Sequence, residues 1–443
     1  MRPPFLIRIL SLLIGIVLFS ASGKAALCAI PLSSSQFTAS LDTGAAIVDE
    51  DLFIPAIIEL GFAANSFELT LQGPFRFRVL DNTPKDAGTL RKQDWDERSD
   101  WARIVRDLQF RKDFADGALR FHAGELNGVY QGYGEIVGHY FNSTDMDHYH
   151  GGLEAAVEIR SNGLELLIND VLAPSIFVGR IYLAPIAWFS KRQIARRFHI
   201  GAWLFVDKGV PSRTLGRRDT GLVAAGMNTG LTLVQSKRGS LETYMSVGAM
   251  DGDAGFHAGF NSNVILSAPK KRGLFFHAEF RYAGEDYYPA LVNPFYDHNR
   301  RFFTRDSVTG ELNTFTDHLA NTAMNVQKAA GFMADLELRF NHVFHLGARY
   351  DYMSKKRPHW LLFRVELVPS KDIAITVFYA AQDIEGGPRI FSLDALMGVA
   401  YHHRLVGPLR IYSEFCRRFR RITNDEVSFA NETELGLGVM FSI

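Results

Sequence analysis

Cysteine is scarce in this chain, which has only Cys28 and Cys416 among its 443 residues. This scarcity excludes a framework of several disulfides, so an exported protein of this size must gain its stability in another way. A surplus of either charge is also missing, because Lys+Arg and Asp+Glu each total 48. Without a basic surplus to neutralise phosphates, nucleic acid is not an expected partner.

Long apolar runs are missing from the chain after its N-terminal segment. The run at 9–19 follows Arg2 and Arg8 and precedes the small residues "SASGKAA". This order predicts a secretory signal peptide over residues 1–28, with cleavage at 23–29. No later run is long enough for a helical membrane span.

Motifs of known chemistry are missing as well. The sequence contains no G-x-S-x-G, no H-E-x-x-H and no Walker G-K-[ST]. "GYGEIVG" at 132–138 precedes no expected helix, so it is not interpreted as a phosphate-binding loop. We therefore expect no catalytic residue and no cofactor. An enzyme on a barrel rim remains an alternative, for which His345, His402 and His403 are available without a serine at a recognisable spacing.

What the sequence has instead is alternation with a period of two residues. In "ELRFNHVFHLGARYD" at 337–351, apolar and charged residues take turns, which predicts strands with one apolar and one charged face. The candidate strands are 52–62, 67–79, 102–111, 118–125, 152–160, 163–170, 176–184, 198–207, 220–235, 241–249, 255–267, 274–283, 328–341, 343–352, 358–367, 372–381, 392–402, 408–419 and 433–443.

The connections between these candidates are of two kinds. Tight turns are expected at 162–164 and 340–344, whereas the long loops are expected at 80–101, 126–151, 208–219 and 284–327. Short turns at one end and long loops at the other are typical of an outer-membrane barrel. Two or three residues between neighbouring strands imply antiparallel pairing.

The last residues resemble the closing strand of bacterial outer-membrane β-barrel proteins. In "ELGLGVMFSI", Leu435, Leu437, Val439, Phe441 and Ile443 share one face. The family pattern ends on an aromatic residue, and here Phe441 stands two positions before the end. The resemblance covers architecture only, and it implies an all-β fold: a closed antiparallel up-and-down transmembrane barrel with long external loops.

The domain prediction follows from this fold. Residues 29–50 are expected to be an N-terminal leader segment, and 51–443 the porin-type barrel. Because bacterial single-chain barrels have an even number of strands, we expect about 16–18 strands, which leave an aqueous channel.

Charged residues on the polar face are expected to line the interior of the barrel. Many stand two residues apart, as Glu279 and Arg281 do, and therefore share one face. Their surplus of arginine predicts a mild preference for anions, with mutual neutralisation of Arg and Glu as the alternative. The predicted lining residues are Arg76, Arg78, Arg103, Arg120, Glu158, Arg160, Glu279, Arg281, Glu337, Arg339, Arg349, Asp351, Arg364, Glu366, Arg410, Glu414 and Arg418.

Two loops contain further candidates. The loop at 283–326 is rich in aromatic residues, and its Arg300, Arg301 and Arg305 are candidates for a constriction if the loop enters the channel. A packed external loop is the alternative. In "DMDHYHGG", the weak metal candidates are Asp145, Asp147, His148 and His150, because carboxylate and imidazole groups bind zinc or calcium.

These features together predict a passive channel for small hydrophilic solutes in the outer membrane of a Gram-negative bacterium. The expected partners are outer-membrane lipid and lipopolysaccharide, the solutes, and the barrel-insertion machinery. The first alternative is a closed structural or adhesive barrel, and the second is a barrel-borne lipid-modifying enzyme. The oligomeric state has no signal in the sequence.

Overall fold

A computed structural model describes most of the chain. The described residues are 36–48, 50–82, 88–189, 196–209, 211–212, 217–218, 221–250, 252–267, 272–300, 304–305, 312–313, 328–341, 343–354, 359–382, 395–423 and 426–442. The predicted signal peptide lies outside them.

Twenty of the described strands form one sheet, in which each strand pairs antiparallel with the next strand of the sheet along the chain. These strands are β1 (Gln36–Val48), β2 (Asp51–Ala64), β3 (Phe67–Leu80), β4 (Val105–Phe114), β5 (Gly117–Gly124), β8 (Gly152–Ile159), β9 (Asn162–Ile168), β10 (Ile176–Leu183), β11 (Phe198–Asp207), β14 (Leu222–Ser236), β15 (Gly239–Met250), β16 (Asp253–Ser267), β17 (Arg272–Ala283), β20 (Ala329–Phe340), β21 (Phe344–Met353), β22 (Trp360–Ser370), β23 (Ile373–Gln382), β24 (Ala395–Val406), β25 (Leu409–Thr423) and β26 (Glu426–Ser442).

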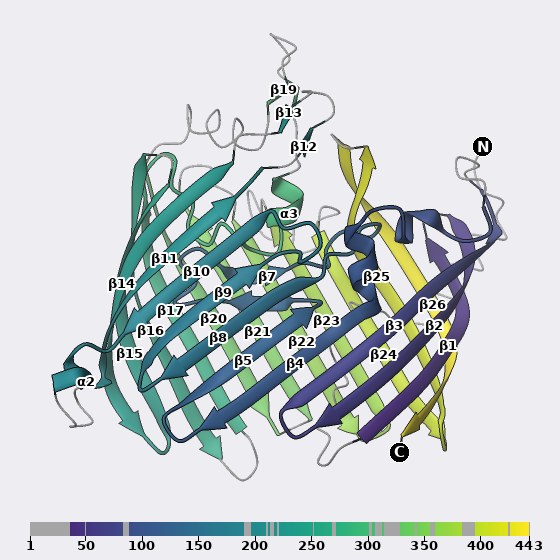
Figure 1. Ribbon diagram of the computed structural model, residues 1–443, viewed down its shortest axis with the longest axis horizontal. Helices are drawn as coiled ribbons and strands as arrows, with labels where there is room; N and C mark the ends of the chain where they lie inside the picture. The colour runs from purple at the N-terminus through teal and green to yellow at the C-terminus, as the bar shows by residue number, and fades with distance from the viewer. Residues whose placement is uncertain are drawn as a thin grey trace.

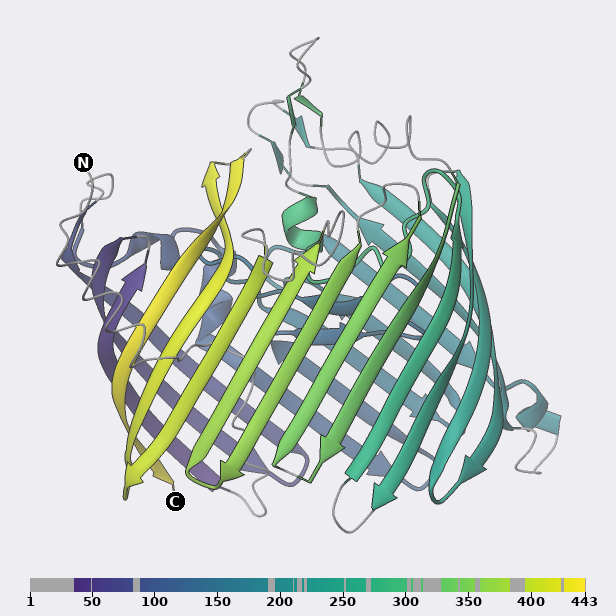
Figure 2. The same cartoon turned by 180° about the vertical axis from the view of Figure 1, so that it is seen from behind.

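The sheet is closed, because its first strand pairs with its last. Leu41 of β1 lies opposite Val439 of β26, and the same strand pairs with β2 on its other side. Figures 1 and 2 show the tilted strands passing around the whole wall from purple β1 to yellow β26. Closure removes both free edges of the sheet, so that the wall can pair its backbone groups without a partner chain.

The two faces of the wall differ as the alternation predicts. On β1, the side chains of Leu41 and Ile47 are exposed on the outside, whereas Asp42 and Ala46 are buried inside. Large apolar side chains are exposed on the outer face all around the barrel, from Ile58 on β2 to Leu437 on β26. A soluble protein would bury such rows, whereas lipid solvates them.

The barrel class is confirmed, but the number of strands is twenty rather than about 16–18. All the candidate segments are strands of the wall, and the additional one is β1. It lies within segment 29–50, which was predicted to be a leader, so the barrel begins before residue 51. The strand was missed because Thr43, Gly44, Ala45 and Ala46 interrupt the rows of large apolar residues.

The two ends of the barrel differ in their connections, as expected. Short turns at 65–66, 115–116 and 160–161 join strands at one end. The predicted loops after β3, β5, β11 and β17 all leave from the other end, which is the upper end in Figure 1. The four predicted long loops therefore leave from a single mouth of the barrel, whereas the connection between β10 and β11, which contains α2, lies at the other end.

Helices in the described part of the chain are short: η1 (Lys92–Asp94), η2 (Ser99–Ile104), α2 (Ile186–Phe189) and α3 (Tyr296–Asn299). None of them is long and apolar enough to cross a membrane. Three small hairpins complete the described elements. They are β6 (Asn127–Tyr130) with β7 (Gly138–Phe141), β12 (Pro211–Ser212) with β13 (Arg217–Arg218), and β18 (Thr304–Arg305) with β19 (Leu312–Asn313).

An outward position in mid-strand tests whether the outer face contacts lipid. Met245 on β15 is 53% exposed, between the buried Tyr244 and Ser246. Met245→Arg is expected to lower the free energy of unfolding in lipid vesicles by about 2–4 kcal/mol, because a charge would enter hydrocarbon. Met245→Leu is the control, with an expected change below about 1.5 kcal/mol. Equal stability of the two variants in denaturant titrations would contradict a lipid-facing surface.

Candidate functional site

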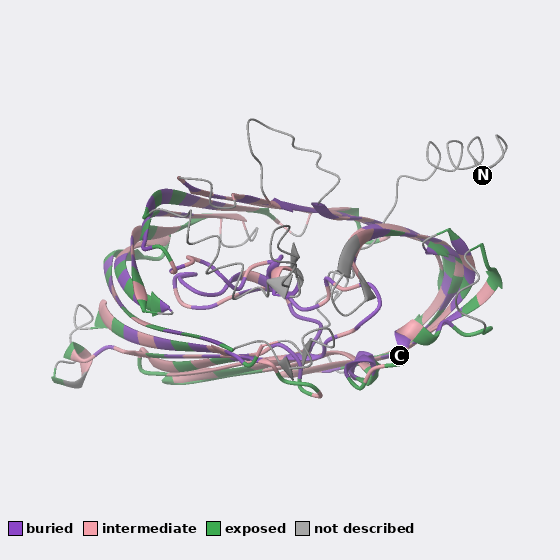
Figure 3. Ribbon diagram, turned by 90° about the horizontal axis from the view of Figure 1, so that it is seen from above, coloured by how far each residue is buried: buried purple, intermediate pink, exposed green. Residues whose placement is uncertain are grey.

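The long loop between β5 and β8 folds into the barrel instead of extending from it. Segment 125–151 connects β5 with β8 and contains the β6–β7 hairpin, and Figure 3 shows buried loops inside the ring of strands. The hairpin turns through Gly132 and Gly134, whose φ angles of 60° and 77° are ones that glycine adopts at little cost. The glycines of "GYGEIVG" therefore form a tight turn in the barrel interior.

The tip of this hairpin is bound to the wall by polar and aromatic contacts. The ring of Tyr133 stacks on Tyr244 of β15 with 4.0 Å between centroids, and its hydroxyl donates to Glu242 at 2.7 Å. Asn228 of β14 donates to the carboxylate of Glu135 at 2.6 Å. The hairpin is therefore fixed against strands β14 and β15.

The long loop after β17 also turns inward over its described residues 284–300. Arg300 forms an ion pair with Asp207 at the end of β11, and the hydroxyl of Tyr296 donates to the same carboxylate at 2.7 Å. All three side chains are almost fully buried. Of the two alternatives for this loop, entry into the channel is the one that describes residues 284–300.

The two inward loops are bonded directly to each other. The amides of Ala290 and Val292 donate to the carbonyls of Glu135 and Ile136, at 2.8 and 2.9 Å. The amide of Gly138 donates back to the carbonyl of Val292 at 3.0 Å. This short ladder joins segments far apart in the sequence, so the loops form one structural unit, hereafter the inner unit (residues 125–151 and 284–300).

The inner unit has an apolar core where it meets the wall. Its tyrosines, valines and leucines pack with large side chains from the neighbouring strands, and this packing excludes water between loop and wall. Buried members of the core include Leu126, Val137, Tyr140, Phe205, Tyr287, Val292 and Tyr296. The interior of the barrel is thus partly filled by protein, which narrows any route through it.

Several predicted lining residues meet in one buried network beneath the inner unit. Arg281 of β17 forms ion pairs with Glu279 on its own strand and with Asp351 of β21. Arg349 lies 3.4 Å from Asp351 and 3.9 Å from Asp335, and both arginines have fully buried side chains. Buried charges persist only when they are paired in this way.

A third internal loop is held by a buried carboxylate. Asp94 on η1 is surrounded by the guanidinium groups of Arg76, Arg91 and Arg103. Burial by itself raises the pKa of the Asp94 carboxyl, but the three guanidinium groups outweigh it and hold that pKa below its ordinary value. Arg91 also pairs with Asp147 of the inner unit, which joins the η1–η2 segment to it.

The remaining predicted lining residues lie in several kinds of place. Arg76, Arg78, Arg364, Arg410 and Arg418 pair with carboxylates of the wall, and Glu366 is the partner of Arg364. Glu158 and Glu414 are half-buried. Arg120 is an exposed residue of β5.

Three of the predicted residues do not occupy mid-strand positions in the wall. Arg103 belongs to η2, and Arg160 lies in a tight turn, where it pairs with Asp116. Arg339 lies close to the turn after β20, with a side chain 64% exposed, and it pairs with Glu337. Arg160 and Arg339 lie near turns, where a charged side chain reaches open water at the barrel end, whereas Arg103 is buried against Asp94.

The three arginines proposed for a constriction have different outcomes. Arg300 is buried and paired with Asp207. Arg301 lies outside the described residues. Arg305 is in β18, of which only the backbone is described. A role in contacting solutes therefore remains a prediction for the latter two, whereas Arg300 anchors the inner unit.

The four weak metal candidates are directed to separate partners. Asp147 pairs with Arg91 and Arg420, and His150 pairs with Asp170 at 3.1 Å. The carboxylate of Asp145 accepts the amides of Asp147 and His148, which makes it part of a local turn. The sequence placed these residues within a short span, but the fold turns their side chains apart.

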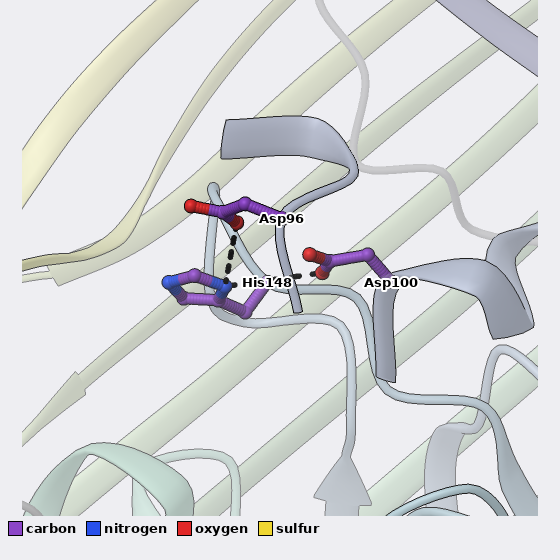
Figure 4. A group of neighbouring side chains, drawn as sticks. All are labelled: Asp96, Asp100 and His148. Carbon is purple, nitrogen blue, oxygen red and sulfur yellow. Dashed lines mark ion pairs between the residues drawn. The ribbon is translucent and has the colours of Figure 1, made fainter. Parts of the chain in front are cut away.

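Only His148 lies in a group that could hold a cation among the described residues. One ligand atom each from His148, Asp96 and Asp100 lies within 4.8 Å of the others, as Figure 4 shows. Burial raises the pKa of the Asp96 carboxyl, an effect that the nearby His148 opposes. The imidazole Nδ1 of His148 lies 3.8 Å from the buried Asp100.

Sequence reasoning missed the residues that bind the inner unit to the wall. Tyr130, Tyr133 and Glu135 come from a loop, and nothing in a loop sequence specifies which strands it will touch. His277 could have been found, because it stands two residues before Glu279 on the same polar face of β17.

Comparisons with known proteins give limited information about this chain. No protein-family model matches it, and no curated protein matches it. Among solved structures, the chain is similar to OccK3 (OpdO) from Pseudomonas aeruginosa, with 10% identity, a TM-score of 0.34, and coverage of 92% of this chain and 96% of that one. It is also similar to OccAB3 from Acinetobacter baumannii, with 11% identity, a TM-score of 0.34, and coverage of 94% and 100%. At these values the likeness supports no functional conclusion, so function must be inferred from the geometry of the chain.

The buried network predicts unequal costs for two similar substitutions. Glu279→Gln is expected to lower the free energy of unfolding by about 3–5 kcal/mol, because it leaves the buried Arg281 without one of its two carboxylates. Glu337→Gln is the matched control. Its side chain is 30% exposed and pairs with the exposed Arg339, so a loss below about 1 kcal/mol is expected. Similar losses in denaturant titrations of the two variants would contradict the role of the network.

Proposed function

We propose that this protein is a passive channel for small hydrophilic solutes in the outer membrane of a Gram-negative bacterium. The observation that carries the proposal is the closed wall of twenty strands, with apolar side chains outside and ionic side chains inside. Such a wall is compatible with lipid on one face and water on the other, and a barrel of this size is wide enough for an aqueous route.

Selection by such a channel would depend on the inner unit. Because residues 125–151 and 284–300 pack together and bind the wall, they restrict the route that a solute can take. Passage then depends on the remaining width and on the charges along it, without any chemical step. No cofactor and no acid or base are needed for this mechanism.

The same inner unit is the observation that favours the alternative of a closed structural or adhesive barrel. Its apolar core and its ladder of hydrogen bonds are features of packed protein. The lipid-modifying enzyme is less well supported. The histidines considered for it contact other wall residues: His345 lies near Glu337 and Glu366, and His402 stacks on Tyr412.

Planar-bilayer conductance distinguishes an open channel from a closed barrel. Wild type is compared with a variant in which Gln131–Val137 is replaced by two glycines. We expect wild type to conduct and the variant to conduct at least about twofold more, because the hairpin tip would no longer narrow the route. Conductance by the variant alone would support the closed barrel. If neither the wild type nor the variant conducts although both are correctly inserted, the channel function would be contradicted.

A mild anion preference is part of the proposal. Many interior arginines pair with carboxylates, as Arg410 does with Asp42 and Arg364 with Glu366, and this pairing reduces the positive field. Arg120 of β5 is exposed, and we infer that this guanidinium faces the solute route. Exposed arginines of this kind would attract anions more strongly than paired ones.

The preference is tested by the reversal potential in a salt gradient. Wild type is expected to show mild anion selectivity, and Arg120→Glu is expected to shift the reversal potential toward cations, because it inverts a charge beside the route. Arg160→Glu is the matched control, since Arg160 lies in a turn with a side chain 70% exposed. Cation selectivity of the wild type would contradict the prediction.

Outer-membrane lipid, lipopolysaccharide and the barrel-insertion machinery remain the partners that this proposal implies. They follow from the location of a transmembrane barrel and not from any particular contact. The predicted signal peptide at 1–28 is consistent with the same location.

A further inference from the structure

A chain of hydrogen bonds connects the hairpin of the inner unit to a buried carboxylate of the wall. The hydroxyl of Tyr130 lies 2.8 Å from Nδ1 of His277 on β17, and Nε2 of His277 contacts the hydroxyl of Tyr244 on β15. Tyr244 in turn donates to Glu279. His277 is fully buried at the centre of this chain.

The hydrogen bond between Tyr130 and His277 requires a proton on Nδ1 of His277. Burial raises the pKa of Tyr130, so its hydroxyl keeps its single hydrogen. That hydrogen is donated to the carbonyl of Tyr133 at 2.7 Å, and a carbonyl can only accept. The contact between Tyr130 and Nδ1 is then a hydrogen bond only if Nδ1 is the donor.

The hydrogen bond between His277 and Tyr244 requires a proton on Nε2 of His277. Glu279 forms an ion pair with the fully buried Arg281, so it is an ionised carboxylate that can only accept hydrogen bonds. Because Tyr244 gives its only hydrogen to Glu279, the imidazole must donate to the oxygen of Tyr244. All contacts are satisfied together only when His277 is an imidazolium with both nitrogens protonated.

The charges around His277 lead to the same conclusion independently. The carboxylates facing this site are Glu279 on its own strand, Asp335 on β20 and Asp351 on β21, and the guanidinium groups are Arg281 and Arg349. Three negative and two positive groups leave one negative charge uncompensated, which a buried site does not tolerate.

Two other histidines face the same site, and the contacts of each need only one ring proton. His139 of the inner unit donates through Nε2 to Asp335 at 2.7 Å. His257 of β16 donates through Nδ1 to Glu279 at 3.0 Å, and its Nε2 lies 2.8 Å from the hydroxyl of Tyr287. The contacts of His277 differ from theirs, because they need a proton on both ring nitrogens.

The carboxylate of Glu279 connects this proton to both loops. Through Tyr244 and His277 it holds Tyr130 in residues 125–151, and through His257 it holds Tyr287 in residues 284–300. A change in the protonation of His277 therefore affects the contacts that attach the inner unit to strands β15, β16 and β17.

We propose that His277 is the proton-binding residue of a latch that ties the inner unit to the barrel wall, and that loss of its proton loosens this attachment. A neutral ring that keeps its proton on Nε2 preserves the charge-assisted hydrogen bond of Tyr244 to Glu279, which is stronger than a hydrogen bond to a carbonyl. Tyr130 then turns its hydrogen to Nδ1, so the carbonyl of Tyr133 loses its partner in the hairpin turn. Low pH therefore holds the inner unit across the interior, and higher pH releases it. The resulting control of conductance rests on the proposed channel function, whereas proton binding and release of the inner unit do not.

Hydrogen exchange of the backbone amides in residues 127–141, corrected for intrinsic rates, tests the latch without reference to transport. In full-length protein between about pH 4 and pH 8, protection is expected to fall by about tenfold or more as His277 loses its proton. His277→Gln, which donates from its amide nitrogen and can only accept at its oxygen, is expected to lack this step and to resemble the high-pH state. Tyr130→Phe is the second variant, in case the first does not fold, and it should also lack the step.

His359→Gln is the matched control, because His359 bonds to the carbonyl of Met353, away from the latch. It should keep the step. Nitrogen NMR of labelled histidine gives a direct readout, with both ring nitrogens of His277 protonated at the low-pH end. Singly protonated His277 at every pH, or a step that survives in both His277→Gln and Tyr130→Phe, would overturn the latch.

Conductance over the same pH range separates this inference from the proposed function. We expect conductance to rise with pH in wild type and in His359→Gln, and to be independent of pH in His277→Gln. A flat profile in a conducting wild type would overturn control by the latch and leave the channel intact. Absence of conductance at every pH would contradict the channel, while exchange and NMR would still decide the latch.

Discussion

The pairing of β1 with β26 is the interaction on which the rest of the structure depends. In hydrocarbon every backbone amide and carbonyl needs a partner within the protein, and an open sheet would leave two edges unpaired. The long register between these strands, from Thr38 with Ser442 to Val48 with Glu432, removes both edges at once. It also joins residues from the two ends of the described chain, so the enclosed interior exists only when the whole sheet has formed.

Closure has an electrostatic consequence, because it places the polar faces of all strands around one interior. Charges that would be solvated on an open sheet must then find partners, and Arg281 and Arg349 do so with Glu279, Asp335 and Asp351. The inner unit contacts this network through Tyr130, which hydrogen-bonds to His277, and through His139, which contacts Asp335. Partial filling of the interior and selective passage are thus two results of the same packing.

Much of the fold could be predicted from alternation, and the failures have physical causes. Pairs such as Glu279 and Arg281 share one face of their strand, because a two-residue spacing determines the face of a strand. Strand β1 was missed because its small residues give a weak apolar row. Asp147 and His150 were grouped as ligands by closeness in sequence, but turns direct them to Arg91 and to Asp170. Which loop residues meet the wall could not be predicted, since those contacts join segments far apart in the sequence, such as Tyr130 and His277, which are 147 residues apart.

The sequence by itself determined which side chains lie on each face of every strand, because successive residues of an extended chain must point in opposite directions. It also determined the positions of most turns and long loops. Only the tertiary structure decided which of those loops turn inward and which acids meet which arginines. These outcomes depend on distances across the closed barrel, and such distances do not exist until the last strand has paired with the first.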